Sequence, residues 1–206
     1  MQFQPFNRLL GSPGADAANV ENLNLGGNSP FLTGIGNGDT NVLNGHDLED
    51  LLYGRGGNDT LNGYSGDDIL DGGAGSDTYY ASRSGGADTV VETVVDGDTD
   101  VLQFMAGVAT NQIWFSHVGG SLEARILGTA DKITLQNWAV GGTAVVEQFK
   151  TTDGNKTLST TQSAFASLVQ AMAGIVPGAS DTSIAAVAMT QPQRDSINTL
   201  LASNWQ

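Results

Sequence analysis

The sequence predicts a mainly β protein in which a right-handed parallel β-roll runs into a β-rich region that ends in one or two helices. Three observations carry this prediction: a nine-residue repeat, alternating apolar residues after the repeat, and helical spacing of apolar residues near the C-terminus. The expected segments are a lead-in over residues 1–35, the roll over 36–100, a β-rich domain over 101–160 and a helical segment over 161–206.

The repeat occupies residues 36–80, which divide without a gap into five nonapeptides: GNGDTNVLN, GHDLEDLLY, GRGGNDTLN, GYSGDDILD and GGAGSDTYY. Position one is always glycine, position six is aspartate except at Asn41, and position eight is leucine except at Tyr79. Because glycines permit tight turns, positions one to six predict a turn, and positions seven to nine predict a short strand with one inward apolar residue. A flexible linker is the alternative for a Gly- and Asp-rich segment, but a linker would not keep this register.

Two nonapeptides would make one coil of the roll, so that units n and n+2 become neighbours. Facing turns then present carbonyl oxygens and position-six carboxylates to a shared gap, an all-oxygen cage that suits Ca²⁺. The expected carboxylate pairs are Asp50–Asp68, Asp59–Asp77, Asp68–Asp88 and Asp77–Asp100. We expect about three to five calcium ions.

Other turn residues are expected to line these gaps beside the carboxylates: Asn41, Gly54, Gly56, Gly57, Asn58, Gly63, Ser65, Gly66, Asp67, Gly72, Ala74 and Gly75. The first two units depart from the pattern, since Asn41 replaces an acid and Leu48 replaces a glycine, which predicts a cap or a weak site. A sixth unit follows after a one-residue slip, with Gly86, Asp88 and Val90 at positions four, six and eight.

Charge and composition exclude several classes of function. The net charge is −14, and residues 36–100 hold 14 of the 22 acidic residues against Arg55 and Arg83, so a nucleic-acid partner is not expected. The absence of cysteine excludes disulfides and thiol chemistry. No stretch approaches the ~20 apolar residues of a membrane span, and the N-terminus shows no cleavable secretory signal.

After the repeats, alternation and β-branching predict strands that continue the sheets of the roll and share its core. The expected strands are 101–104, 112–115, 122–127, 132–135 and 145–149, with hairpin turns at Gly119–Gly120 and 153–155. Trp114 and Trp138 are expected to be core residues. Helices are expected over residues 161–172 and 192–205.

The nonapeptides resemble those of RTX (haemolysin-type calcium-binding) proteins, which Gram-negative bacteria export through type I secretion systems. VENLNL before the repeats, DVLQF, ITLQNW and VEQF after them, and the final LLASNWQ are similar to flanking segments of such proteins. The resemblance implies a secreted chain that folds when it meets extracellular calcium. It also implies an uncleaved C-terminal secretion signal, the type I machinery as a partner and an upstream passenger domain.

An enzyme is not expected, because no nucleophile elbow, zinc-protease motif or P-loop is present and the two histidines are far apart in sequence. The pair Asp67–Asp68 could mimic a glycosidase pair, but it lies in the repeat register. The alternatives left open are an adhesin or glycan-binding module, with Arg55 and Tyr64 facing outward, and the accessory module of a secreted protease, lipase or polysaccharide epimerase.

Overall fold

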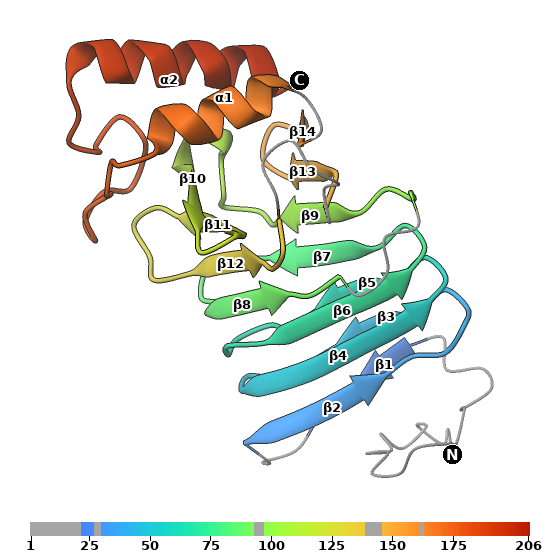
Figure 1. Ribbon diagram of the computed structural model, residues 1–206. Coiled ribbons are helices and arrows are strands. Elements are labelled where there is room, and N and C mark those ends of the chain that lie inside the picture. The colour runs from blue at the N-terminus through green and yellow to red at the C-terminus, as the bar shows by residue number, and fades with distance from the viewer. Residues whose placement is uncertain (1–21, 27–29, 93–96, 139–145, 161–162) are drawn as a thin grey trace.

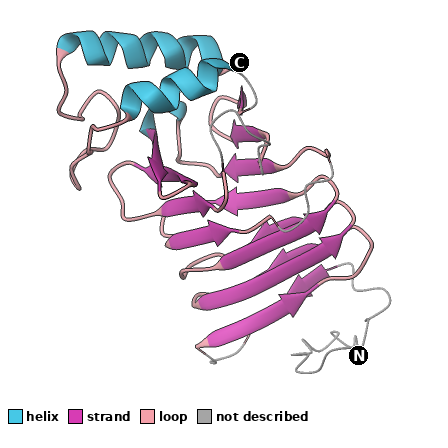
Figure 2. Cartoon of the chain, viewed as in Figure 1, coloured by secondary structure: helices cyan, strands magenta, loops and turns pink. Residues whose placement is uncertain are grey.

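The computed structural model of the chain describes residues 22–26, 30–92, 97–138, 146–160 and 163–206. These residues form two seven-stranded β-sheets and two α-helices (Figure 1). The N-terminal strands lie at one end of the sheets and the helices cover the other end (Figure 2). The mainly β class and the parallel β-roll are therefore confirmed.

Successive strands alternate between the two sheets. The first sheet contains, in spatial order, β1 (Asn22–Asn24), β3 (Val42–Asn44), β5 (Thr60–Asn62), β7 (Thr78–Ala81), β9 (Val101–Phe104), β13 (Gln148–Thr151) and β14 (Lys156–Ser159). The second contains β2 (Phe31–Ile35), β4 (Glu49–Gly56), β6 (Ile69–Ala74), β8 (Ala87–Val90), β12 (Lys132–Leu135), β11 (Ser121–Ile126) and β10 (Ile113–Val118), the last preceded by a 3-10 turn over Thr110–Gln112.

Alternate nonapeptides pair in parallel, as the repeat predicts. Leu43 in β3 lies opposite Leu61 in β5, which in turn lies opposite Tyr79 in β7. On the other sheet, Leu52 in β4 lies opposite Leu70 in β6. Partners are 18 residues apart, which is two repeat lengths, so all turns of odd-numbered units stack in one column and those of even-numbered units in another.

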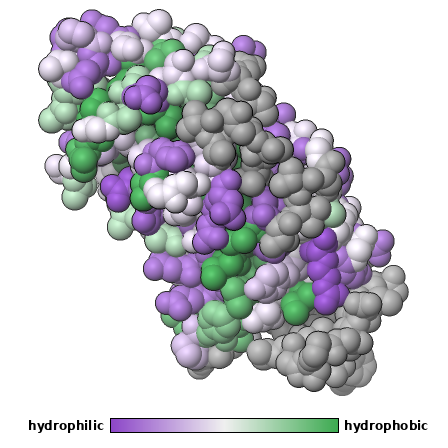
Figure 3. All heavy atoms as spheres, viewed as in Figure 1, coloured by the Kyte–Doolittle hydropathy of each residue, from purple (hydrophilic) through white to green (hydrophobic). Residues whose placement is uncertain are grey.

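The core of the roll is one side chain deep. The position-eight residues fill the space between the sheets, and their exposure is 0–1%: Leu43, Leu52, Leu61, Leu70 and Tyr79. The outer faces are open to water, and the face in Figure 3 shows apolar side chains interspersed with hydrophilic ones. With so thin an apolar layer, the turns must contribute a large share of the stability of the roll.

The predicted sixth unit is present. Ser84 and Gly86 adopt left-handed conformations, with φ of 64° and 100°. β8 then pairs with β6, and Val90 is fully buried. The slip is two residues long rather than the predicted one, since Leu70 lies opposite Val90, 20 residues later instead of 18. It is absorbed before the turn, and the register is restored at the strand.

The sheets of the roll continue into the C-terminal part of the chain without a break. β12 pairs in parallel with β8, and β13 pairs in parallel with β9. Antiparallel hairpins complete each sheet, with turns at Gly119–Gly120 and at 153–155 as predicted. β13 begins at Gln148, later than the predicted strand, whose first residue lies outside the described residues. The prediction of one shared core is confirmed.

Two helices close the C-terminal end over an aromatic cluster. α1 (Ser163–Met172) buries Phe165 against Phe115, Phe149 and Trp138, with ring centroids 5.1–5.7 Å apart. α2 (Gln191–Asn204) carries a proline in its first turn and packs on α1. Trp114 and Trp138 are 1% and 2% exposed, so both are core residues as predicted. No helix in the described part of the chain is long and apolar enough to cross a membrane.

Of the predicted lead-in, residues 1–21 and 27–29 lie outside the described residues, and the remainder supplies β1 and β2. The first two residues of the helix predicted over 161–172 also lie outside them.

Candidate metal sites between the stacked turns

The turns of units three to six share one backbone shape. Position two is left-handed at Arg55, Tyr64, Gly73 and Ser84, and position four is left-handed at Gly57, Gly66, Gly75 and Gly86. Position four also touches the turn stacked beside it: a Cβ on Gly75 would lie 2.2 Å from the carbonyl oxygen of Gly57. Glycine is therefore required there both by conformation and by space.

The position-six side chains form a ladder along each column of turns. Each position-six N–H donates to a carboxylate oxygen two units later: Asn41 to Asp59 (2.7 Å), Asp59 to Asp77 (2.7 Å), Asp77 to Asp100 (2.8 Å), Asp50 to Asp68 (2.8 Å) and Asp68 to Asp88 (3.2 Å). The four carboxylate pairs predicted from the sequence are thus brought together in space. Asp59 and Asp68 belong to different columns, so they do not face each other.

Position five forms a second ladder that runs in the opposite direction. The Oδ1 atoms of Asn58 and Asp67 accept the N–H groups of Ser76 (3.0 Å) and Ala87 (2.8 Å). Adjacent turns are therefore linked by two reciprocal hydrogen bonds. Asp67 is exposed, and its Oδ1 atom takes part in this second ladder.

The ladder uses only one oxygen of each carboxylate. Asp59 and Asp68 are each 1% exposed, and their Oδ2 atoms are buried without a hydrogen-bond partner among the described residues. These oxygens point at the position-one glycine of their own turn: a Cβ on Gly54 or Gly63 would lie 2.2 or 1.9 Å from them. A buried anionic oxygen without a partner is costly. A cation that takes oxygen ligands would remove this cost, so the residues fit Ca²⁺.

Burial changes the acidity of these groups. The pKa of Asp59 is raised to about 6, that of Asp68 to about 7 and that of Asp88 to about 8, chiefly because burial penalises the charged form. The N–H donors of the ladder offset part of this increase, and neighbouring carboxylates add to it for Asp68 and Asp88. Each group therefore holds a proton more readily than an ordinary aspartate does, and a bound cation would take the place of that proton.

The first two turns are closed differently. In unit one, the side-chain amide of Asn41 donates to Asn37 Oδ1 (3.1 Å) and its oxygen accepts the Asn37 N–H (2.8 Å). In unit two, the N–H of His46 donates to Asp50 Oδ2 (2.6 Å), and His46 Nδ1 lies 2.9 Å from the same carboxylate. Neither turn has a left-handed residue. In unit one the two side chains satisfy each other. In unit two Asp50 still has a buried oxygen, Oδ1, that accepts no hydrogen bond from the described residues, although it lies 2.9 Å from His46 Nδ1.

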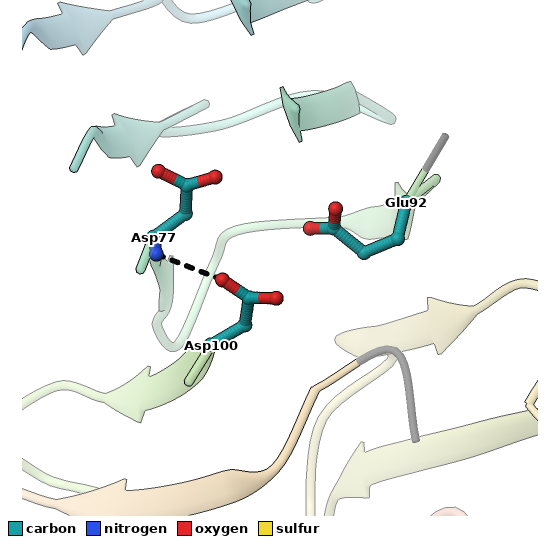
Figure 4. Close-up of side chains that lie close together, drawn as sticks. All are labelled: Asp77, Glu92 and Asp100. Carbon is teal, nitrogen blue, oxygen red and sulfur yellow. Dashed lines mark hydrogen bonds between the residues drawn. The ribbon is translucent and has the colours of Figure 1, made fainter. Parts of the chain in front are cut away.

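Two acidic residues that the sequence analysis missed extend the odd-numbered column. Glu147 Oε2 accepts the N–H of Asp100 at 2.8 Å. Glu92 lies beside Asp77 and Asp100 (Figure 4), and the hydroxyl of Tyr79 donates to Glu92 Oε1. Neither residue lies at position six of a nonapeptide. The one signal in the sequence is Tyr79, which places a polar atom at a position that is otherwise leucine.

Stacked glycine turns, ladders of buried aspartates and a thin apolar core define a calcium-binding β-roll module. Comparison with family models agrees: the RTX calcium-binding nonapeptide repeat (four copies) matches residues 44–79, and the haemolysin-type calcium binding protein related domain matches residues 122–156. These matches support an RTX protein: the chain carries RTX calcium-binding repeats and a segment similar to the related domain. A comparison with curated proteins returns no match.

Proposed function

We propose that the chain is a calcium-dependent folding module that is exported by a type I secretion system and folds outside the cell. The observation that carries the proposal is the buried Oδ2 atom on both Asp59 and Asp68, which has no hydrogen-bond partner in the described part of the chain. Without a cation these oxygens oppose the stacking of the turns. With calcium the same oxygens become ligands, so the free energy of binding becomes free energy of folding.

The calcium ligands would come from the four stacked pairs of position-six carboxylates and from turn carbonyls beside them. Asp68 belongs to two pairs, with Asp50 and with Asp88, and Asp77 belongs to two pairs in the other column. This arrangement supports the expected three to five ions, and shared carboxylates would make their binding cooperative.

Export is supported by the acidic, glycine-rich composition of residues 36–100, which favours an unfolded chain when calcium is scarce. In this proposal the type I machinery of a Gram-negative cell recognises residues 161–206 before they fold. In the folded chain α1 and α2 pack together at the end of the sheets. The secretion signal would therefore no longer be accessible to the machinery once the chain has folded. The module would stabilise or present an upstream passenger without catalysis of its own.

The proposal is tested by a far-UV circular dichroism titration of the calcium-stripped chain with CaCl₂, with MgCl₂ as the control. A cooperative gain of β signal with calcium alone, at about 10⁻⁴–10⁻³ M, is expected for an extracellular calcium module. A chain already folded without calcium and indifferent to it would refute calcium-dependent folding. Export is tested separately by secretion of the full chain and of a chain lacking residues 161–206 from cells that carry a type I system.

A further inference from the structure

Glu92 occupies a special place at the C-terminal end of the roll. It is the first residue after the sixth unit, and Val91 extends β8 by donating its N–H to the carbonyl oxygen of Leu70 (2.9 Å). At the corresponding place, position one, the earlier turns of this column have Gly54 and Gly72, which lie within β4 and β6. A long acidic side chain therefore begins where the preceding turns have no side chain at all.

This side chain is buried and only half satisfied. Glu92 is 8% exposed, and its Oε1 atom accepts a hydrogen bond from the hydroxyl of Tyr79. That hydroxyl is itself fixed, because it accepts the N–H of Gly72 at 2.8 Å. The second oxygen, Oε2, is buried and has no hydrogen-bond partner within the described chain.

The unsatisfied carboxylate points at two others. One carboxylate oxygen from each of Asp77, Glu92 and Asp100 lies within 4.8 Å of the others, and all three residues are buried (Figure 4). Three charges so close together in a buried site repel each other strongly. A divalent cation bound by all three removes this repulsion and uses the oxygen that the protein leaves without a partner.

We propose that Asp77, Glu92 and Asp100 form a calcium site of a second kind, in which a glutamate that stands where earlier turns have glycine provides a ligand. The inference rests on the proposed calcium-dependent folding and gives its Asp77–Asp100 pair a third carboxylate, at the place where the roll joins the C-terminal region. Glu92 follows β8 in one sheet and Asp100 precedes β9 in the other, while the Asp100 N–H is bound by Glu147, just before β13. An ion here ties the end of the roll to both sheets of the region that follows.

The alternative is a neutral Glu92 that keeps a proton and needs no ion. The substitution Glu92→Gln distinguishes the two, because the amide resembles a protonated carboxyl in shape and in its ability to donate, but it lacks the charge. Glu49→Gln on the exposed edge of β4 is the matched control. Calcium bound per chain is measured by native mass spectrometry and isothermal titration calorimetry, with circular dichroism in saturating calcium to establish that each variant folds.

We expect Glu92→Gln to bind one calcium ion fewer, or to bind one ion at least about tenfold more weakly, while Glu49→Gln matches the wild type. Tyr79→Phe, which removes the hydroxyl that orients Glu92, should weaken the same ion by a smaller factor. If Glu92→Gln folds and binds the same number of ions with the same affinities, the site is a protonated carboxyl and the inference is overturned. If wild-type and variant chains alike bind no calcium, the proposed function itself fails.

If Glu92→Gln does not fold even in saturating calcium, calcium binding by Tyr79→Phe tests the site instead. A weakened ion in Tyr79→Phe supports the site, and unchanged calcium binding in that variant overturns it.

Discussion

The first two turns of the roll have the same length as the turns that follow, but their position-six side chains interact with different partners. Asn41 and Asp50 are bonded within their own turns by Asn37 and His46. Asp59 and Asp68 each keep a buried Oδ2 atom that has no hydrogen-bond partner among the described residues, whereas the buried Oδ1 atom of Asp50 lies 2.9 Å from His46 Nδ1. The comparison teaches that a nonapeptide turn can be closed by side chains or by an ion, and that one or two residues decide which.

The largest effect is expected from neutralising a carboxylate in the later turns. Asp68→Asn keeps an oxygen that can accept the Asp50 N–H, but it removes one charge from two neighbouring gaps. The calcium midpoint of folding should rise about tenfold or more, because calcium affinity depends on ligand charge. The measurement is the circular dichroism titration, with Asp47→Asn, at an exposed position of the second turn, as control. Equal midpoints in the two variants would contradict the assignment of Asp68.

A slightly smaller effect is expected from filling the space beside the carboxylate. In Gly63→Ala the new methyl group would lie 1.9 Å from Asp68 Oδ2, so the carboxylate must move out of its position. We expect a loss of roughly 1–3 kcal/mol of stability in saturating calcium, measured by urea unfolding. Gly38→Ala in the first turn, where a Cβ meets nothing within 4 Å, should have little effect. A similar loss in both variants would show that the turn, not the site, is responsible.

The difference between the two kinds of turn also shows what the sequence could predict. Glycine, aspartate and leucine recur at fixed positions because each coil repeats the same contacts, so the roll, its register and the carboxylate pairs follow from the period. The sixth unit was predictable despite its slip, since Gly86 and Asp88 keep their spacing to Val90. The region after the roll was predictable as strands, because its apolar residues alternate.

The contacts that the sequence did not predict join residues that share no period. Glu92 meets Tyr79 across 13 positions and Asp100 meets Glu147 across 47, and neither separation is a multiple of nine. The closure of the first turns was also missed, because it depends on the rotamers of Asn37 and His46 rather than on their presence. Such contacts form where the repeat ends and other segments of the chain pack against it. No local sequence pattern encodes which residues meet there.

The pH dependence of the calcium-free chain should reveal the buried carboxylates of the later turns. Burial raises the pKa of Asp59, Asp68 and Asp88 to about 6, 7 and 8, above the value of about 4 for an unfolded aspartate. Folding therefore takes up protons, so their favourable contribution is fully present below about pH 4 and is lost as pH rises through 6 to 8.

Acidifying calcium-stripped protein from about pH 8 to about pH 5 should thus increase its β signal, and the calcium midpoint at pH 5 should be higher than at pH 8 because protons compete for the same oxygens. Both are measured by circular dichroism at constant ionic strength. A calcium-free chain that loses β signal over this range would contradict the idea that buried carboxylates oppose its folding.

The smallest effect is expected from Asn41→Asp, which gives the first turn the residue found at position six of the others. This substitution tests most directly how the first turns differ from the later ones. The change removes the donor to Asn37 Oδ1 and places two oxygens against each other. Calcium-free stability should fall by about 1 kcal/mol, and calcium should restore it, because the carboxylate now faces that of Asp59 two units away. Stability is measured by urea unfolding with and without calcium.

Asn44→Asp is the matched control, since it also breaks an Asn–Asn hydrogen bond, the one from Asn44 Nδ2 to Asn24 Oδ1 at 2.6 Å, but lies on a strand outside the turns. Its loss of stability should be the same with and without calcium. If calcium fails to rescue Asn41→Asp as well, a carboxylate alone does not convert a turn. The left-handed glycine at position four, which units one and two lack, is then the second requirement for an ion-dependent turn.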